Sequence, residues 1–204
     1  MITIVDYGLG NIAAFLNMYK RMNIPAKAVS TAEDLAEADR IVLPGVGAFD
    51  HAMASLDASG MRPTLERLVE KERKPIIGIC VGMQILTDGS DEGERPGLGW
   101  IPGRTRAFSG NAAAKGLPLP HMGWNDVVPD SGRQLFAGLE NDSRFYFLHS
   151  YYVECAAKGD RAAHTEYGEE FACAIHRDNV WGVQFHPEKS HHFGAAVLKN
   201  FAAL

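Results

Sequence analysis

The stretch IIGICVGMQ, residues 76–84, carries the strongest structural signal in this chain of 204 residues. It begins with a continuous apolar run, which is typical of a strand buried on both faces of a parallel sheet. The run ends at Cys80, which lies between Gly78 and Gly82. A core cysteine needs no flanking glycines, whereas a nucleophile on a sharp turn between a strand and a helix does. The stretch therefore predicts a parallel α/β sheet with an exposed thiol at its edge.

Strand and helix signals alternate along the first half of the chain. Strands are expected at residues 2–6, 26–29, 40–45 and 75–80, and helices are expected to begin near residues 11, 31 and 63. Ser30 and Glu33 form a capping-box pattern for the second of these helices. Continuous apolar strands that alternate with helices indicate a parallel sheet with helices on both faces.

The second half of the chain changes character. Glycine and proline are dense between residues 88 and 132, and helical periodicity is absent there. Later strands, in part antiparallel, are expected at residues 143–154, 171–177 and 179–188, followed by a helix over 191–203. No stretch resembles a linker, and no internal repeat is present. We therefore expect one domain over residues 1–204, a three-layer α/β/α fold with a central mixed, mostly parallel sheet.

Composition argues against several function classes. The formal net charge of −5 disfavours nucleic acid as a partner, because phosphate binding usually requires a basic face. No apolar run approaches the ~20 residues of a membrane span, and the first residues lack a signal-peptide pattern. Three cysteines without a CxxC pair argue against zinc and against a disulfide framework, and they favour the cytoplasm.

We expect no metal and no cofactor. The histidines do not form a compact ligand set, so they are interpreted as scattered surface or interface residues. These are His121, His149, His191 and His192.

Cys80 is the candidate nucleophile. Free cysteine is more often a buried structural residue, but Cys80 lies at the carboxyl end of an expected parallel strand, where α/β sheets bind ligands. The helix that follows directs its N-terminal dipole at the sulfur and favours the thiolate. The main-chain N–H of Val81 is then placed as an oxyanion donor, and the loop PGVGAF, residues 44–49, can supply a second donor.

The motif FHPEKS, residues 185–190, supplies a base and a carboxylate. His186 and Glu188 are two residues apart, so they project to the same side of an extended segment. A carboxylate beside an imidazole fixes its tautomer and stabilises the imidazolium. Cysteine, histidine and glutamate together indicate acyl transfer through a thioester, with peptides, esters and side-chain amides all open as substrates.

These motifs resemble those of the class I (triad) glutamine amidotransferases. Three further stretches, DYGLGN, LPGVGAF and PHMGWN, are similar to the family of glutaminase subunits of imidazole glycerol phosphate synthases, and the similarity runs essentially end to end. The resemblance implies a flavodoxin-like core and a triad of Cys80, His186 and Glu188 that hydrolyses L-glutamine to glutamate and ammonia. One departure is Val81, where family members most often have leucine.

The resemblance also implies roles for further residues. They are an oxyanion hole at Val46, Gly47 and Val81, glutamine contacts at Gly47, Gln84, Ser150 and Tyr151, and partner contacts at Asn11, Met122, Trp124 and Lys189. The implied partner is a separate cyclase subunit, a (β/α)8 barrel. It would receive the ammonia through an internal passage and form imidazole glycerol phosphate and aminoimidazole carboxamide ribotide.

Three alternatives remain open at the level of sequence. The chain could be the glutaminase subunit of another synthase, for example one of anthranilate or pyridoxal phosphate synthesis. It could be a thiol peptidase or esterase on a similar scaffold, or a binding subunit with a vestigial triad. Trp124 could cap the core rather than face a partner.

Overall fold

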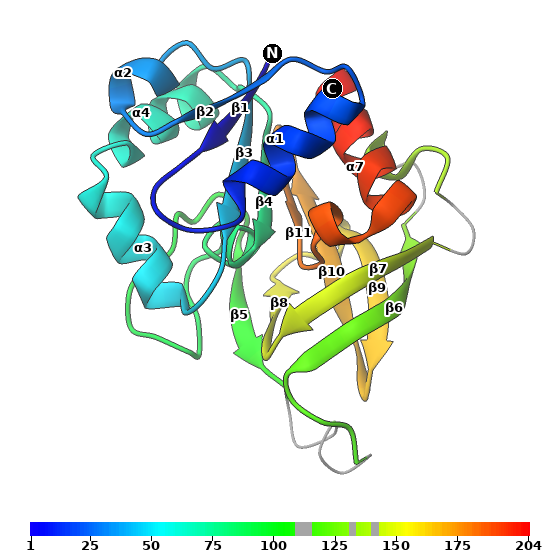
Figure 1. The fold of residues 1–204 in the computed structure, drawn as a ribbon. Helices are drawn as coiled ribbons and strands as arrows, with labels where there is room; N and C mark the ends of the chain where they lie inside the picture. The colour runs from blue at the N-terminus through cyan, green and yellow to red at the C-terminus, as the bar shows by residue number, and fades with distance from the viewer. Residues whose placement is uncertain (109–115, 131–133, 140–142) are drawn as a thin grey trace.

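The fold is built around one mixed sheet (Figure 1). The computed structural model describes residues 1–108, 116–130, 134–139 and 143–204. Within them the strands are β1 (Ile2–Val5), β2 (Ala26–Val29), β3 (Arg40–Gly45), β4 (Ile76–Cys80), β5 (Gly103–Ala107), β6 (His121–Pro129), β7 (Ser143–His149), β8 (Tyr151–Cys155), β9 (Arg161–Tyr167), β10 (Glu169–Arg177) and β11 (Val180–Val183). The helices are α1 (Ile12–Arg21), α2 (Ala32–Leu35), α3 (Phe49–Ala58), α4 (Arg62–Glu66), α5 (Val81–Gln84) and α7 (His191–Ala203). A π-helical turn, Arg67–Lys71, extends α4.

The described strands pair in the order β2-β1-β3-β4-β11-β10-β9-β6-β7, with β8 against β10 and β5 against β8. Neighbours from β2 to β11 are parallel, and those from β11 to β7 are antiparallel. Helices α1 and α7 lie on one face of the parallel part, and α2, α3 and α4 lie on the other (Figure 1). The expected three-layer α/β fold with a mixed sheet is confirmed. The expectation that the sheet is mostly parallel is wrong: among the described strands four pairings are parallel and six are antiparallel. In the second half, successive strands such as β9, β10 and β11 are joined by connections too short for parallel pairing.

The parallel part matches the sequence closely because its inner strands are buried along all or nearly all of their length, whereas β2 at the edge is partly exposed. Every residue of β1, β4 and β11 is buried, which produces the continuous apolar runs that the sequence shows. The N-terminal boundary of α2 differs from the prediction. Thr31 rather than Ser30 caps this helix, since its side chain accepts a hydrogen bond from the main-chain N–H of Asp34.

The antiparallel part contains strands that the sequence did not indicate. Strands β5, β6 and β9 lie where glycine, proline or short polar alternation hides them. In β7 buried and exposed positions alternate, as expected for a sheet with one face toward the core. The expected single strand over residues 143–154 is interrupted at Ser150, where the chain turns from β7 into β8.

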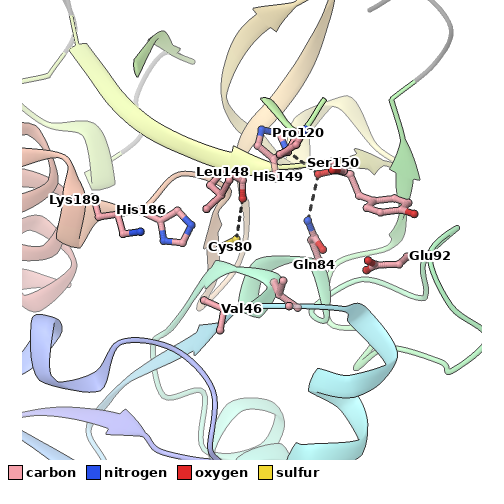
Figure 2. A pocket seen from close by; sticks show the side chains of 13 residues that line it. Val46, Cys80, Gln84, Glu92, Pro120, Leu148, His149, Ser150, His186 and Lys189 are labelled. Atoms are coloured by element: carbon pink, nitrogen blue, oxygen red, sulfur yellow. Dashed lines mark hydrogen bonds between the residues drawn. The ribbon is translucent and has the colours of Figure 1, made fainter. Parts of the chain in front are cut away.

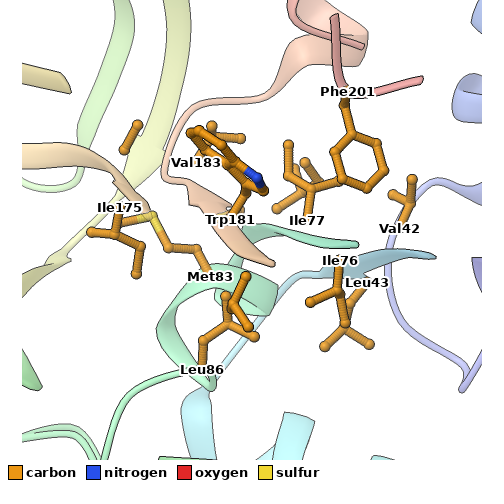
Figure 3. Close-up of a cluster of buried hydrophobic side chains, with 14 of the residues drawn as sticks. Val42, Leu43, Ile76, Ile77, Met83, Leu86, Ile175, Trp181, Val183 and Phe201 are labelled. Atoms are coloured by element: carbon orange, nitrogen blue, oxygen red, sulfur yellow. The ribbon is translucent and has the colours of Figure 1, made fainter. Parts of the chain in front are cut away.

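Apolar side chains fill both sides of the parallel strands (Figure 3). Ile77 of β4 lies on the side of Phe201 from α7, whereas Ile76 lies on the side of Met83 from α5 (Figure 3). Each such side chain contributes about 1.5–3 kcal/mol by leaving water. No helix in the described ranges has the length and apolar character that crossing a bilayer would require.

Glycines allow the short helix α5 to rest directly on the main chain of the sheet. A Cβ atom at Gly82 would lie 2.0 Å from the carbonyl oxygen of Leu43 in β3. A Cβ atom at Gly78 would lie 2.3 Å from the carbonyl oxygen of Gly82. Real Cβ atoms do not approach main-chain atoms so closely, so these two positions require glycine for packing.

Replacing Gly82 with alanine should lower the free energy of unfolding by about 2 kcal/mol or more, because the clash is with main chain that cannot rotate away. Gly159→Ala is the matched control: a Cβ atom there meets nothing within 4 Å, so its effect should stay within about 0.5 kcal/mol. Urea denaturation of both variants measures the difference. Equal stability of the two variants would contradict the packing argument.

Candidate active site

Cys80 lies on a sharp turn between β4 and α5. Its backbone has φ +55° and ψ −114°, a conformation that non-glycine residues rarely adopt. Such a backbone costs on the order of 1–3 kcal/mol and persists only where the surroundings enforce it. The enforcing contacts are those of Gly78 and Gly82 with the main chain. The turn places the cysteine at the carboxyl edge of the sheet, as the sequence predicts. The expected exposure of its thiol is wrong, because Cys80 is only 5% exposed and lies among the residues that line a pocket.

The Cys80 side chain faces a pocket of about 300 Å³ (Figure 2). Segments from β3, β4, the β7–β8 corner and the loop after β11 converge there. The lining residues are Val46, Gly47, Cys80, Val81, Gln84, Glu92, Pro120, Leu148, His149, Ser150, Tyr151, His186 and Lys189. The residues expected for the oxyanion hole and for glutamine contacts all line this one pocket. Their roles in binding and catalysis stay predictions.

His186 and Glu188 form a buried pair beside the sulfur. The Nδ1 atom of His186 lies 2.9 Å from Oε1 of Glu188, and both side chains are buried. Ser190 braces the turn, because its hydroxyl donates to the carbonyl oxygen of His186 at 2.7 Å and accepts from the N–H of Tyr146 at 2.9 Å. The imidazole is therefore held in one orientation, and its other nitrogen is left for the thiol.

Two opposing effects set the pKa of His186. Burial alone lowers it, but the hydrogen bonds and charge interactions with Cys80 and Glu188 outweigh burial and raise the pKa to about 9. The imidazole therefore keeps a proton through neutral pH. A protonated His186 beside the sulfur can give that proton to a departing amine.

A chain of amides links the pocket wall to the nucleophile. The Nε2 atom of Gln84 donates to the carbonyl oxygen of Tyr151 at 3.2 Å and to Oε1 of Gln184 at 3.1 Å. Gln184 in turn donates to the Cys80 sulfur at 3.7 Å. Gln184 was not expected in the site, since one glutamine in an apolar strand carries no local signal.

Glu92 is a second residue that the sequence did not single out. It lies in the glycine- and proline-rich section, lines the pocket, and accepts a hydrogen bond from the N–H of Phe49 at 2.8 Å. Asp50 holds the same loop, because it accepts from the N–H groups of Glu94 and Arg95, each at 3.0 Å. A fixed carboxylate in this pocket suits the ammonium group of a free amino acid.

The interpretation of the histidines as surface or interface residues is wrong for two of them. His121 is 3% exposed and His149 is 6% exposed, and their rings are hydrogen bonded to each other at 2.9 Å. His191 and His192 are exposed as expected. Among the described residues no group of three or more histidine, cysteine or acidic side chains could hold a metal ion.

The residues expected to contact a partner lie on β6, on the turn before α7 and at the start of α1. Met122 is 65% exposed and Trp124 is 40% exposed, with its ring stacked on His191 at 5.2 Å. Trp124 is thus not a buried cap of the core. Lys189 lines the pocket with Nζ 5.5 Å from the ring centre of Tyr146. Asn11 caps α1 by accepting from the N–H of residue 14 at 3.1 Å.

Comparison with known proteins gives one consistent result. The family model described as Glutamine amidotransferase class-I matches residues 3–203. A curated relative from Bdellovibrio bacteriovorus, named imidazole glycerol phosphate synthase subunit HisH, is 59% identical over 204 residues and 100% of both chains. A relative of the same name from Leptospira interrogans is 48% identical over the same 100% of both chains. A solved structure described as a glutamine amidotransferase has a TM-score of 0.77 at 19% identity, covering 100% of this chain and 99% of that one, which shows the fold alone.

Replacing Glu188 with glutamine removes the charge that favours the imidazolium, so the pKa of His186 should fall from about 9 by a unit or more. An NMR titration of the His186 ring measures this shift. Glu92→Gln is the control, because Glu92 lines the same pocket without a bond to His186, and its effect should be much smaller. An unchanged pKa in the Glu188 variant would contradict the assigned pairing.

The same pKa predicts how stability depends on pH. Since the folded value lies above the ordinary value of 6.5, the folded protein binds this proton more tightly than the unfolded chain. The resulting stabilisation is complete below about pH 6.5 and is lost as the pH rises through about 9. The wild type should therefore lose unfolding free energy relative to His186→Gln as the pH rises from about 6.5 to about 9. Urea denaturation of both proteins at a series of pH values measures this loss.

Proposed function

Since this chain belongs to the class I glutamine amidotransferase family, we propose that it is the glutaminase subunit of an imidazole glycerol phosphate synthase. It hydrolyses L-glutamine and supplies the ammonia for a step of histidine biosynthesis. The observation that carries the proposal is the strained Cys80 turn facing the buried pair of His186 and Glu188 across one pocket. The end-to-end identity to subunits of that name supports the choice of synthase.

Substrate binding is the first step of the mechanism. A pocket of about 300 Å³ suits a small molecule, and glutamine carries an ammonium, a carboxylate and an amide. The carboxylate of Glu92 pairs with the ammonium group, and the main chain at Ser150 and Tyr151 holds the α-carbon end. The side-chain amide then extends toward Cys80.

Attack by the Cys80 sulfur on the amide carbon forms a tetrahedral oxyanion. The N–H groups of Val81 and of the segment Val46–Gly47 are the donors to this oxygen. His186 gives its proton to the amide nitrogen, so ammonia leaves and a γ-glutamyl thioester remains. Water then attacks the thioester while His186 takes up a proton. Collapse of the second intermediate breaks the C–S bond, releases glutamate and restores the Cys80 thiolate beside the protonated imidazole, with Glu188 orienting the ring throughout.

The ammonia needs a receiving subunit, because free ammonia in water would protonate and diffuse away. We assign this role to a cyclase subunit that folds as a (β/α)8 barrel and docks over the pocket mouth. The docking face consists of Asn11, Met122, Trp124 and Lys189. An exposed methionine and tryptophan on one strand are unusual on a free surface and typical of an interface.

A thiol peptidase is the alternative on the same scaffold. A peptide substrate has no free ammonium group at the residue that is cleaved. The carboxylate of Glu92, held by the N–H of Phe49, would then have no substrate ammonium group to bind in the pocket. This favours a free amino acid over a peptide.

Replacing Cys80 with alanine should abolish glutamine-dependent synthesis by the complex, by at least about 10³-fold, because the covalent step is lost. Synthesis from added ammonium salt should persist, since the cyclase chemistry does not need the thiol. Cys155→Ala is the matched control, because Cys155 lies on β8 outside the pocket. A coupled assay with purified cyclase measures both nitrogen donors. Full glutamine-dependent activity in the Cys80 variant would establish a non-catalytic subunit instead.

Replacing Trp124 with alanine should weaken binding to the cyclase by tenfold or more, because aromatic residues contribute strongly at interface centres. Val128→Ala is the control: Val128 is exposed on the same face of β6, about 13 Å along the strand from Trp124. Titration calorimetry measures both affinities. Equal affinities for both variants would place the docking face elsewhere.

A further inference from the structure

A pair of buried histidines lies behind the pocket, and the reaction described above does not use it. His121 begins β6, His149 ends β7, and the two residues lie opposite each other in the strand register. The Nδ1 atom of His121 is 2.9 Å from Nε2 of His149. His149 lines the pocket (Figure 2).

The hydrogen-bond partners determine the tautomer of each ring. The Nδ1 atom of His149 lies 2.7 Å from the carbonyl oxygen of Tyr151, which can only accept, so Nδ1 carries the hydrogen. In a neutral His149 ring Nε2 then accepts from Nδ1–H of His121. The Nε2 atom of His121 accepts in turn from the amide of Asn125 at 3.3 Å. The Asn125 amide is itself oriented, because its oxygen accepts from the N–H of Asp126 and its nitrogen donates to the carbonyl of Glu166.

The surroundings keep both rings neutral. The His121 ring is stacked between Phe147 at 4.8 Å and Tyr167 at 4.0 Å. Burial lowers the pKa of His121 to about 4 and that of His149 to about 3. Near neutral pH the chain of donors therefore runs in one direction, from Asn125 through both rings to the Tyr151 carbonyl.

The end of this chain is the corner between β7 and β8. The Tyr151 carbonyl accepts from His149 and also from Gln84. Ser150 lies between the two strands at this corner and lines the pocket together with Tyr151. The bond from His149 to Tyr151 closes the corner, so it sets the position of the main chain at Ser150.

The other end of the chain lies on the strand that carries the docking face. Side chains alternate along β6, so Met122 and Trp124 point outward while His121 and Asn125 point inward. Outward Met122 pairs with Leu148 across the strands, next to the inward pair of His121 and His149. Strand β6 thus contributes side chains both to the exposed face and to the hydrogen bonds behind the pocket wall.

We propose that His121 and His149 are positioning residues for glutamine: they hold the Ser150–Tyr151 corner in the shape that receives the substrate and connect it to β6. The proposal rests on the proposed glutaminase function. It predicts a loss of affinity for glutamine, because the hydrogen bonds of the pair end at the Tyr151 carbonyl and not at the sulfur or the imidazole of the triad. The use of ammonium salt should be unaffected.

The test uses the purified complex with cyclase and the variants His149→Leu and His121→Leu. Each should raise the KM for glutamine about tenfold, the effect of about one lost hydrogen bond, with kcat changed by less than about threefold. His149→Asn retains a donor near the Nδ1 position and should recover part of the affinity. Because the pair acts as a unit, the double leucine variant should be little worse than the worse single variant.

A matched control exists elsewhere in the chain. His176 donates from Nε2 to the carbonyl of Asp178 at 2.8 Å, also two residues ahead, but it stacks on Trp181 away from the pocket. His176→Leu should leave the KM for glutamine unchanged. A wild-type complex without glutaminase activity would refute the proposed function itself. Unchanged KM values in both leucine variants, or an equal loss with ammonium salt, would refute only the positioning role.

A second measurement does not depend on activity. Nitrogen-15 NMR of the wild-type protein should show the Nδ1–H tautomer for both His121 and His149. Loss of His121 should change the His149 signals while those of His176 stay the same. An Nε2–H tautomer at His149 would overturn the proposal even if the leucine variants failed to fold.

Discussion

The left-handed backbone at Cys80 is the constraint on which the site depends. A cysteine pays a steric cost there, and only rigid surroundings can maintain it. Those surroundings are main-chain contacts, because α5 rests on β3 and β4 through Gly82 and Gly78 with no side chain between them. Main chain within a parallel sheet hardly moves, so the sulfur has one position. Every other group in the pocket is placed relative to that fixed atom.

The groups that act on this sulfur come from the antiparallel side of the sheet. The loop after β11 brings His186 and Glu188, and the corner between β7 and β8 brings Ser150. Strand β11 is the junction, since it is parallel to β4 and antiparallel to β10. The parallel part thus supplies the proposed nucleophile and oxyanion donors, and the antiparallel part supplies the proposed acid–base group and a wall of the pocket. Changes in the antiparallel part can therefore alter the wall of the pocket while the backbone of Cys80, which the parallel part holds, stays in place.

The sequence predicted those features whose cause is local. Continuous apolar runs revealed β1 to β4, glycines around Cys80 revealed the turn, and the spacing of His186 and Glu188 revealed the pair. Features with distant causes were missed. Strand β5 pairs with β8, about 45 residues away, and β6 pairs with β7 and β9 across long connections. Strand β9 pairs with its neighbour β10, but its short polar alternation gives no clear periodic signal. The positions of Glu92 and the two buried histidines depend on hydrogen bonds to residues 28 or more positions away in the sequence. Examples are Phe49 for Glu92 and His149 for His121.

The alternation of a β-strand explains why one short motif serves two purposes. Within PHMGWN, His121 and Asn125 of β6 face the core, whereas Met122 and Trp124 face outward. A single strand register therefore fixes both sets of side chains at once. A slip by one residue would bury Met122 and expose His121, and it would remove the docking face and the pocket wall together. The proposed docking face and the proposed glutamine site are therefore linked by backbone geometry as well as by side-chain contacts. A partner that presses on the outer face of β6 acts on the same strand that supports the glutamine site, so the two requirements constrain the motif jointly.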